Sequence, residues 1–256
     1  MDDFARAAIA VEHLTKRYGD VAAVDDLTFY VQHGTTTGLL GGNGAGKTTT
    51  LSMLVGLLLP DSGRIQVLGV DMLRHRYRAL GRMNYSSPYV DLPFRLTVWD
   101  NLRVYAGLYG LARPRERIYA LAEELTLVPF LKRAYGSLSA GQKTRVALAK
   151  ALLNEPEVLL MDEPTASLDP DMADYVRTYL KRYQARTGAT MLLASHNMTE
   201  VERICDDVII LREGKKVDQG APHALIVKHG RRTLEDVFID IARRRSPEDD
   251  VPEAAS

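Results

Sequence analysis

A glycine-rich segment near the start of the chain has the spacing of a phosphate-binding loop. Residues 41–48 read GGNGAGKT, which matches the pattern G-x-x-x-x-G-K-[ST]. Glycines allow backbone N–H groups to wrap around a phosphate, and a helix that starts at Gly46 adds partial positive charge. The residues expected to contact phosphate are Gly41, Asn43, Gly44, Ala45, Gly46, Lys47, Thr48 and Thr49.

Three side chains of this loop have distinct expected roles. Lys47 is expected to reach the β- and γ-phosphate oxygens, and the hydroxyl of Thr48 to ligate Mg²⁺. Thr49 is expected to help hold the α-phosphate. A glycine-rich turn that serves packing alone is the alternative, but the apolar run TTTGLL before the loop and a helical pattern after it favour a nucleotide site.

Two adjacent acids end an apolar run further along the chain. Residues 158–165, VLLMDEPT, have the pattern of a buried parallel strand that brings carboxylates to the C-terminal edge of a sheet. Asp162 is expected to hold Mg²⁺ through its water shell, and Glu163, facing the other way, to polarise the attacking water. The same pattern also suits an ordinary strand end, and only the upstream loop makes catalysis the better interpretation.

A second segment with anion-binding features is LSAGQ, at residues 138–142. It directly precedes KTRVALAKALL, a helical pattern whose candidate N-cap is Ser139. A helix N-terminus with a serine hydroxyl and a glycine can bind an anion. One nucleotide does not need two γ-phosphate sites in one chain, so this segment requires another explanation.

Taken together, these segments resemble the ATP-binding cassette (ABC) family over about residues 9–219. In that family the LSGGQ signature of one subunit completes the ATP site formed by the phosphate loop of another. The resemblance implies Glu163 as the catalytic base and a dimer with shared sites. The signature residues that it assigns to ATP binding across the dimer are Ser139, Ala140, Gly141 and Gln142.

Three further positions match the family in the same order. Tyr18, in KRYG, is similar to the aromatic residue that stacks on adenine. Asp169, in SLD, is similar to the D-loop aspartate that links the two sites, and His196, in LLASHN, to the histidine that contacts the γ-phosphate and helps position water. Each has an ordinary alternative when taken alone, because Tyr18 also suits a surface aromatic and His196 a hydrogen-bonded strand end.

The chain also departs from the family at three places. Ala140 replaces the second glycine of the signature, and Gly42 stands where proline is common; both changes are expected to be tolerated. Family members place a glutamine near Ser87 or Pro88, where it contacts Mg²⁺ and senses the membrane partner. Residues 83–102 contain no glutamine, so Ser87 is the candidate for a replacement metal ligand.

The elements that must position these residues alternate between strands and helices. Short β-type runs are expected at 9–14, 27–31, 35–40, 158–161, 190–194 and 208–211. Residues 98–153 read mainly helical and suggest an insertion of about 89–153. The predicted fold is α/β: a P-loop NTPase core with a mixed sheet, an N-terminal antiparallel β subdomain and an inserted helical subdomain.

The C-terminal part is expected to be a separate attachment. TLEDVFIDIA places Leu234, Val237, Phe238 and Ile241 on one helical face, and the polar stretch that follows is expected to be disordered. The predicted units are therefore an ATP-binding domain at 1–228 and a docking helix with a tail at 229–256.

Composition narrows the class of protein. The 256 residues include 33 basic and 33 acidic side chains, so no net positive charge indicates nucleic acid as a partner. Cys205 is the single cysteine, which excludes an internal disulfide. The N-terminal residues do not resemble a signal peptide, and no apolar run approaches the roughly 20 residues of a membrane helix. A cytosolic setting fits these features.

These features predict an ATP-hydrolysing subunit of an ABC transporter, with ATP and Mg²⁺ as cofactors. We expect a second nucleotide-binding subunit, in a homodimer, and separate transmembrane permease subunits. The chain would sit peripherally on the cytoplasmic face of the cell membrane and energise export, by analogy with exporters of drugs, polysaccharides or lipids. Two alternatives remain: a soluble cassette ATPase acting on ribosomes or DNA, and a cassette that binds ATP without hydrolysing it.

Overall fold

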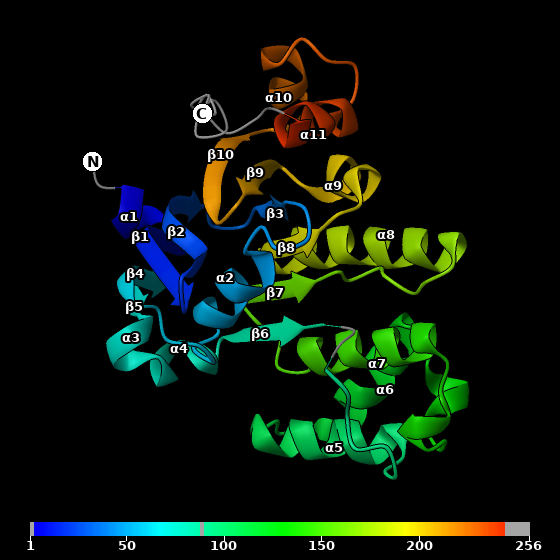
Figure 1. Cartoon of the computed structure of the whole chain (residues 1–256). Helices are drawn as coiled ribbons and strands as arrows, with labels where there is room; N and C mark the ends of the chain where they lie inside the picture. Colours follow the sequence, from blue (N-terminus) through cyan, green and yellow to red (C-terminus); the bar gives the residue numbers. More distant parts are fainter. Residues whose placement is uncertain (1–2, 88–89, 244–256) are drawn as a thin grey trace, which may run out of the picture.

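A six-stranded sheet forms the centre of the molecule (Figure 1). The computed structural model describes residues 3–87 and 90–243. The sheet runs in the order β10 (Lys215–Gly220), β9 (Asp207–Arg212), β3 (Thr36–Leu40), β8 (Thr190–Ser195), β7 (Val158–Asp162) and β6 (Met83–Ser86). All neighbours are parallel except β10, which pairs antiparallel with β9 at the edge. The carboxyl ends of β3, β7 and β8 therefore lie at one edge of the sheet.

The central strands divide their side chains between two hydrophobic cores. Every residue of β3, β7 and β8 is buried, as expected for parallel strands covered on both faces. In β7, Val158 and Leu160 enter one core, whereas Leu159 and Met161 enter the other. This alternation follows from the two-residue repeat of a strand and directs the backbone of β7 along the boundary of the two cores.

An antiparallel sheet covers the first core together with α2 (Lys47–Leu54). Its order is β2 (Val21–Val31), β1 (Ile9–Tyr18), β4 (Ser62–Val67) and β5 (Val70–Asp71). The strands β1 and β2 extend beyond the predicted runs, through residues 15–18 and 21–26, because they pair along the whole length of the hairpin. Short helices α1 (Asp3–Arg6), α3 (Met72–His75) and α4 (Tyr77–Leu80) flank this sheet.

The helical subdomain packs on the second core. It contains α5 (Val98–Leu108), α6 (Pro114–Glu124) and α7 (Ala140–Leu152), with short 3₁₀ turns η1 (Val128–Phe130) and η2 (Tyr135–Ser137). Thr97 caps α5 by accepting a hydrogen bond from the Asp100 N–H at 3.0 Å, and Pro114 opens α6. These elements confirm the predicted fold class, including the antiparallel subdomain and the inserted helices.

The remaining helices are α8 (Pro170–Thr187), α9 (Met198–Ile204), α10 (Pro222–Lys228) and α11 (Leu234–Arg243). Leu234, Val237 and Ile241 of α11 are buried in the second core, and the Leu234 N–H donates to Glu202 Oε1 of α9 at 2.7 Å. The predicted disordered tail lies outside the described residues from 244 onward, and the predicted unit boundaries stay predictions. Within the described ranges, no helix has the length and apolar character needed to span a bilayer.

Candidate active site

The glycine-rich loop connects β3 to α2 and is shaped by close backbone contacts. Gly46 has a φ of 95°, and a Cβ atom there would lie 2.4 Å from the Ala23 carbonyl oxygen. A Cβ on Gly41 would lie 2.6 Å from that of Ala45. Only glycine fits at these two positions, so the sequence spacing is a steric requirement of the turn. The turn leaves the first N–H groups of α2 directed toward the loop, where an anion can accept from them.

Lys47 lies across this loop. Its Nζ donates to the Gly41 carbonyl oxygen at 2.6 Å and to that of Gly42 at 3.1 Å. Burial lowers the pKa of the Lys47 ammonium, and the nearby carboxylates of Glu163 and Asp162 act in the opposite direction. The cation is therefore held where the loop and the two acids meet.

A pocket of about 380 Å³ opens over the loop. It is lined by residues 42–49 and, from β2, by Val21, Ala22 and Ala23. Tyr18 lies at the end of β1 and pairs across the hairpin with Val21, which lines the pocket; 54% of the surface of Tyr18 is exposed. An exposed ring beside the loop is available for stacking.

The first acid meets the loop directly. Thr48 Oγ1 donates to Asp162 Oδ2 at 3.0 Å. Asp162 is 3% exposed, and burial raises the pKa of its carboxyl. Three weaker influences lower the pKa of Asp162: the hydrogen bond from Thr48, the charge of Lys47 and the interaction with Tyr85. The first predicted acid and the predicted hydroxyl ligand are thus in contact at the C-terminal end of β7.

Tyr85, on β6, is a residue that the sequence did not single out. Its hydroxyl interacts with both Ser87 and Asp162, and burial, the largest influence, raises its pKa. Ser87 is 4% exposed, and the Tyr85 hydroxyl is its link to the acid at the end of β7. The adjacent Pro88 lies outside the described residues. The only sequence signal for Tyr85 was its place on the strand that precedes the expected glutamine.

The second acid faces a histidine from the next strand. Glu163 Oε1 lies 2.6 Å from His196 Nδ1, and the Glu163 N–H donates to the Ala194 carbonyl oxygen at 2.9 Å. Glu163 has a φ of 50°, a left-handed conformation that costs a non-glycine residue roughly 1–2 kcal/mol. That turn separates the carboxylate of Glu163 from that of Asp162. The two predicted catalytic residues, far apart in the sequence, are in contact.

The signature segment belongs to the helical subdomain and does not share these contacts. Ser139 is the N-cap of α7, as predicted: its Oγ accepts from the Gln142 N–H at 3.3 Å, while Gln142 Oε1 accepts from the Ser139 N–H at 3.0 Å. Ser139 and Ala140 are exposed. The extra methyl group of Ala140 therefore points to open surface, and this departure leaves the helix start intact.

Gly141 and the D-loop residues are neighbours. A Cβ on Gly141 would lie 3.1 Å from the Ser167 carbonyl oxygen. Asp169 caps α8 by accepting from the Met172 N–H at 3.0 Å, and its charge acts on Arg145 of α7. The signature helix and the D-loop therefore form one surface, beside the acidic strand end rather than inside the loop pocket.

Glu200 is a second residue that sequence reasoning missed. It is 1% exposed, and its carboxylate accepts hydrogen bonds from Thr165 Oγ1 at 2.7 Å and Ser195 Oγ at 2.6 Å. Burial raises the pKa of this carboxyl. The two hydrogen bonds lower the same pKa, but by less than burial raises it. The sequence contained one signal, an Asn-x-x-Glu helix start at Asn197, but that pattern predicts an exposed capping side chain rather than a buried one.

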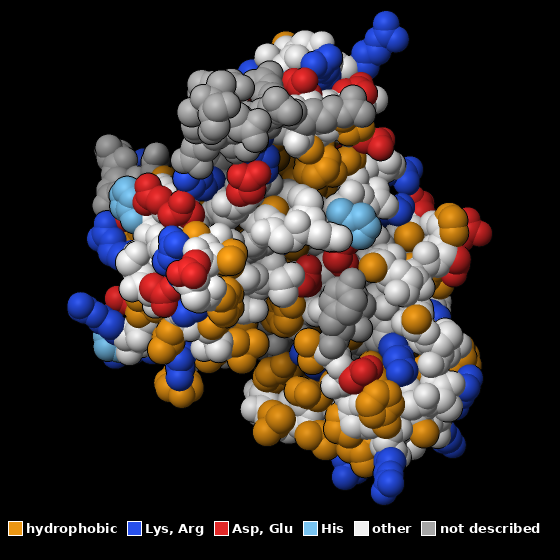
Figure 2. Space-filling view, in the orientation of Figure 1, with side chains coloured by type: hydrophobic (Ala, Val, Ile, Leu, Met, Phe, Trp, Pro, Cys, Tyr) orange, Lys and Arg blue, Asp and Glu red, His pale blue; other side chains and the backbone are white. Residues whose placement is uncertain are grey.

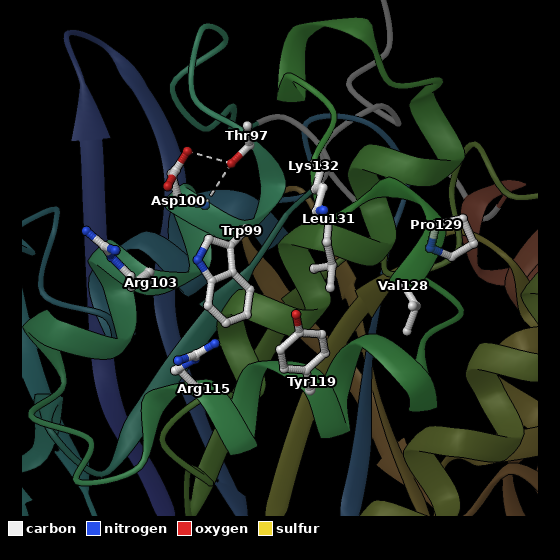
Figure 3. A pocket seen from close by; sticks show the side chains of 10 residues that line it. All are labelled: Thr97, Trp99, Asp100, Arg103, Arg115, Tyr119, Val128, Pro129, Leu131 and Lys132. Atoms are coloured by element: carbon white, nitrogen blue, oxygen red, sulfur yellow. Dashed lines mark hydrogen bonds between the residues drawn. The ribbon is translucent and has the colours of Figure 1, made fainter.

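A larger pocket, of about 670 Å³, lies away from this chemistry in the helical subdomain (Figure 3). Trp99 of α5 and Tyr119 of α6 form its aromatic wall, with ring centroids 5.1 Å apart. Arg103 and Arg115 lie beside them, and Lys132 lines the opposite end. None of the residues predicted to act on nucleotide lines this pocket, so its size does not mark the active site.

Comparisons with known proteins agree with this geometry. A family model described as "ABC transporter" matches residues 24–166. "Nod factor export ATP-binding protein I" of Ralstonia nicotianae is 41% identical over 234 residues, covering 91% of this chain and 73% of the relative. The protein of the same name from Rhizobium sp. is 38% identical over 236 residues, covering 91% and 77%.

Solved structures show the same fold. An ATP-binding subunit of an ABC transporter superposes with a TM-score of 0.85 and 28% identity, covering 93% of this chain and all of that chain. The cbiO1 protein of Clostridium perfringens, described as part of the ABC transporter complex cbiONQ, gives 0.76 and 29%, covering 95% and 97%. With the loop, the acidic strand end and the signature helix in place, the chain belongs to the ABC transporter family as an ATP-binding and ATP-hydrolysing subunit.

Proposed function

We propose that this chain powers export across the cytoplasmic membrane as one half of a head-to-tail dimer, bound to separate membrane subunits on the cytoplasmic face. The observation that carries the proposal is the division of the machinery within one chain. Lys47, Asp162 and Glu163 gather at one site, whereas Ser139 caps a helix on another surface. A second copy, turned head to tail, supplies the missing signature to each loop. The names of the relatives support export as the direction of transport.

ATP is held by the loop in this proposal. The N–H groups at the start of α2 and the Lys47 ammonium bind the phosphates, and Tyr18 stacks on the adenine. The oxygen atoms of Thr48 and Asp162, 3.0 Å apart, form the hard donor set that suits Mg²⁺. When bound, Mg²⁺ would neutralise charge on the β- and γ-phosphates.

Glu163 and His196 perform the proton transfer and positioning steps. Glu163 accepts a proton from the attacking water, because its carboxylate is directed away from Asp162 and is only partly exposed. His196, 2.6 Å from that carboxylate, fixes its orientation and contacts the γ-phosphate. Closure of the dimer over ATP would move the membrane subunits, and hydrolysis would reopen it.

Exposed apolar side chains support a membrane-subunit partner. Leu57 and Tyr77 are 78% and 80% exposed beside Arg76, whose guanidinium donates to the Gly56 carbonyl oxygen. Leu108, 74% exposed, ends α5 next to Tyr109, which donates to Asn84 of β6. Figure 2 shows hydrophobic side chains gathered over both α4 and the facing end of α5. Exposed apolar groups on this scale are typical of protein-binding surfaces.

The test of hydrolysis uses Glu163→Gln. This variant keeps the shape of the side chain but cannot accept the proton, so ATP turnover should fall by at least about 100-fold while ATP binding persists. Size-exclusion chromatography with ATP should then show a trapped dimer. Glu116→Gln, an exposed acid on α6, is the matched control. Near-normal turnover by Glu163→Gln would remove this residue from the role of base.

The test of the partner uses the apolar surface. Leu57→Glu together with Leu108→Glu should abolish recovery of an integral membrane protein with the chain from detergent extracts, while the isolated chain still hydrolyses ATP. Val227→Glu on α10, where the valine is 65% exposed, is the control and should leave recovery unchanged. Recovery of ribosomes or DNA in place of a membrane protein would favour the soluble-cassette alternative.

A further inference from the structure

A buried carboxylate links the two loops that carry the proposed catalytic pair. Glu200 lies in the first turn of α9, yet its side chain turns inward and uses both oxygen atoms. Oε1 accepts from Thr165 Oγ1 at 2.7 Å, and Oε2 accepts from Ser195 Oγ at 2.6 Å. Thr165 is two residues after Glu163, and Ser195 directly precedes His196. Glu200 thus joins the loop after β7 to the end of β8.

These contacts close a ring. On one side, Glu163 and His196 touch at 2.6 Å. On the other side, the carboxylate of Glu200 holds the residues that flank them in the sequence, Thr165 and Ser195. The backbone bond from the Glu163 N–H to the Ala194 carbonyl oxygen joins the two segments where the strands end, and the Glu200 carboxylate joins them again through side chains beyond that point.

The burial of Glu200 is costly, which argues against a role in capping alone. A buried carboxylate loses its hydration and needs strong hydrogen bonds in return. The helix start does not need this side chain, because Asn197 Oδ1 already accepts the Glu200 N–H at 3.1 Å. The Asn197 N–H donates to Ser195 Oγ at 3.1 Å rather than to Glu200. The carboxylate serves the two loops instead of the helix.

We propose that Glu200 is a positioning residue for ATP hydrolysis, which holds the Glu163 and His196 loops at the separation that keeps the two side chains in contact. The inference rests on the roles proposed above for Glu163 and His196. Glu200 contacts neither the phosphate loop nor Lys47 through these bonds, so its effect falls on the chemical step rather than on ATP binding. A displacement of about 1 Å at a reacting group is enough to lower a rate by up to about 100-fold.

The experiment compares kcat and KM for ATP in a set of variants of the full chain. Glu200→Gln keeps the side-chain size, but its amide nitrogen cannot accept one of the two hydroxyl hydrogen bonds. We expect kcat to fall by about tenfold or more with KM for ATP within about twofold of the unchanged protein. Thr165→Val and Ser195→Ala each remove one of the same hydrogen bonds and should show the same split between kcat and KM.

Two comparisons separate positioning from stability. Asn197→Ala removes the cap of α9 and leaves the carboxylate contacts in place, so it should lower the melting temperature but leave kcat near its original value. The loss of kcat in Glu200→Gln combined with Thr165→Val should be smaller than the product of the single losses, because both act through one contact. Equal kcat losses in Asn197→Ala and Glu200→Gln, or fully multiplicative losses in the double variant, would overturn the proposal.

Glu163→Gln, measured in the same series, separates this inference from the proposed function. If Glu163→Gln keeps its turnover, the assignment of the base fails and the inference about Glu200 fails with it. If Glu163→Gln loses turnover but all three variants around Glu200 keep their kcat, only the positioning role is refuted. Should Glu200→Gln not fold, Thr165→Val and Ser195→Ala decide the question by themselves.

Discussion

Two helices of this chain, α2 and α7, begin with segments suited to anions, but their N-termini are built differently. At α2 the N-cap is Gly46, which has no side chain to satisfy the first N–H groups. At α7 Ser139 and Gln142 form a reciprocal capping box, in which the Ser139 hydroxyl accepts a hydrogen bond from the Gln142 N–H. The first helix start has no side-chain cap, whereas the second has one and presents an exposed serine.

The surroundings of the two helix starts differ in the same way. Around α2 lie Lys47, Asp162 and Glu163, which supply the charge and the acids for chemistry. Beside the start of α7 lies the D-loop, and the charged groups that interact there are Asp169 and Arg145 of α7 itself. This difference fits the proposed division, in which the α2 site binds and cleaves ATP and the α7 surface contacts a nucleotide held by a second copy.

The strongest test of this comparison places a change in the phosphate loop and a change in the signature on different chains of one dimer. Lys47→Ala disables a loop, and Ser139→Asp disables a signature through charge repulsion while aspartate preserves the cap of α7. A mixed dimer with one change on each chain retains one intact composite site and should keep a large part of its ATPase activity. A dimer with both changes on the same chain retains none and should lose at least about 100-fold.

The measurement is ATPase activity of the two mixed dimers, purified through two different affinity tags. Homodimers of either single variant serve as controls and should both be inactive. If the dimer with both changes on one chain were instead the more active of the two, loop and signature would act within one chain, and the proposed sharing of sites between two chains would be wrong.

The effect of Asp162 on the stability of the folded chain gives a second test of the α2 region. Burial raises the pKa of its carboxyl in the folded chain, so the ionised form is disfavoured there and stability falls as pH rises through the unfolded pKa toward the folded one. Asp162→Asn removes this penalty and should stabilise the nucleotide-free chain at neutral pH by about 1 kcal/mol. The same change should abolish Mg²⁺-dependent ATP hydrolysis.

Thermal unfolding at several pH values, with and without Mg-ATP, checks this expectation. The gain in melting temperature from Asp162→Asn should shrink at acid pH, where the original carboxyl is protonated. A loss of stability at neutral pH would show that the interactions with Thr48 and Tyr85 outweigh burial.

The smallest expected effect concerns Ser87. If its hydroxyl replaces the missing glutamine, Ser87→Ala should lower Mg²⁺-dependent hydrolysis by several-fold, roughly 1 kcal/mol, more than it lowers ATP binding. Ser86→Ala, the adjacent buried serine on β6, is the matched control. An unchanged Mg²⁺ dependence in Ser87→Ala would assign the role to another group, for which Tyr85 is the nearest candidate.

Much of the site was predictable because its residues lie in short local patterns. The loop 41–48 needs glycine where the turn has no room for a Cβ, and the capping box of Ser139 spans four residues. The order of strand, loop and helix also follows from local periodicity. Strand ends were less predictable, since the β1–β2 hairpin extends through residues 15–18 and 21–26, whose mixed polar and apolar sequence lacks a two-residue alternation.

By itself, then, the sequence determined the phosphate loop, the acidic strand end, the signature helix and the family to which they belong, because each depends on neighbours in the chain. Only the tertiary structure decided that Glu163 meets His196, that Tyr85 reaches Asp162, and that Glu200 turns inward to bridge two loops. The physical reason is that parallel strands bring distant carboxyl ends to one sheet edge, and burial there selects hydrogen-bond partners that no local spacing records.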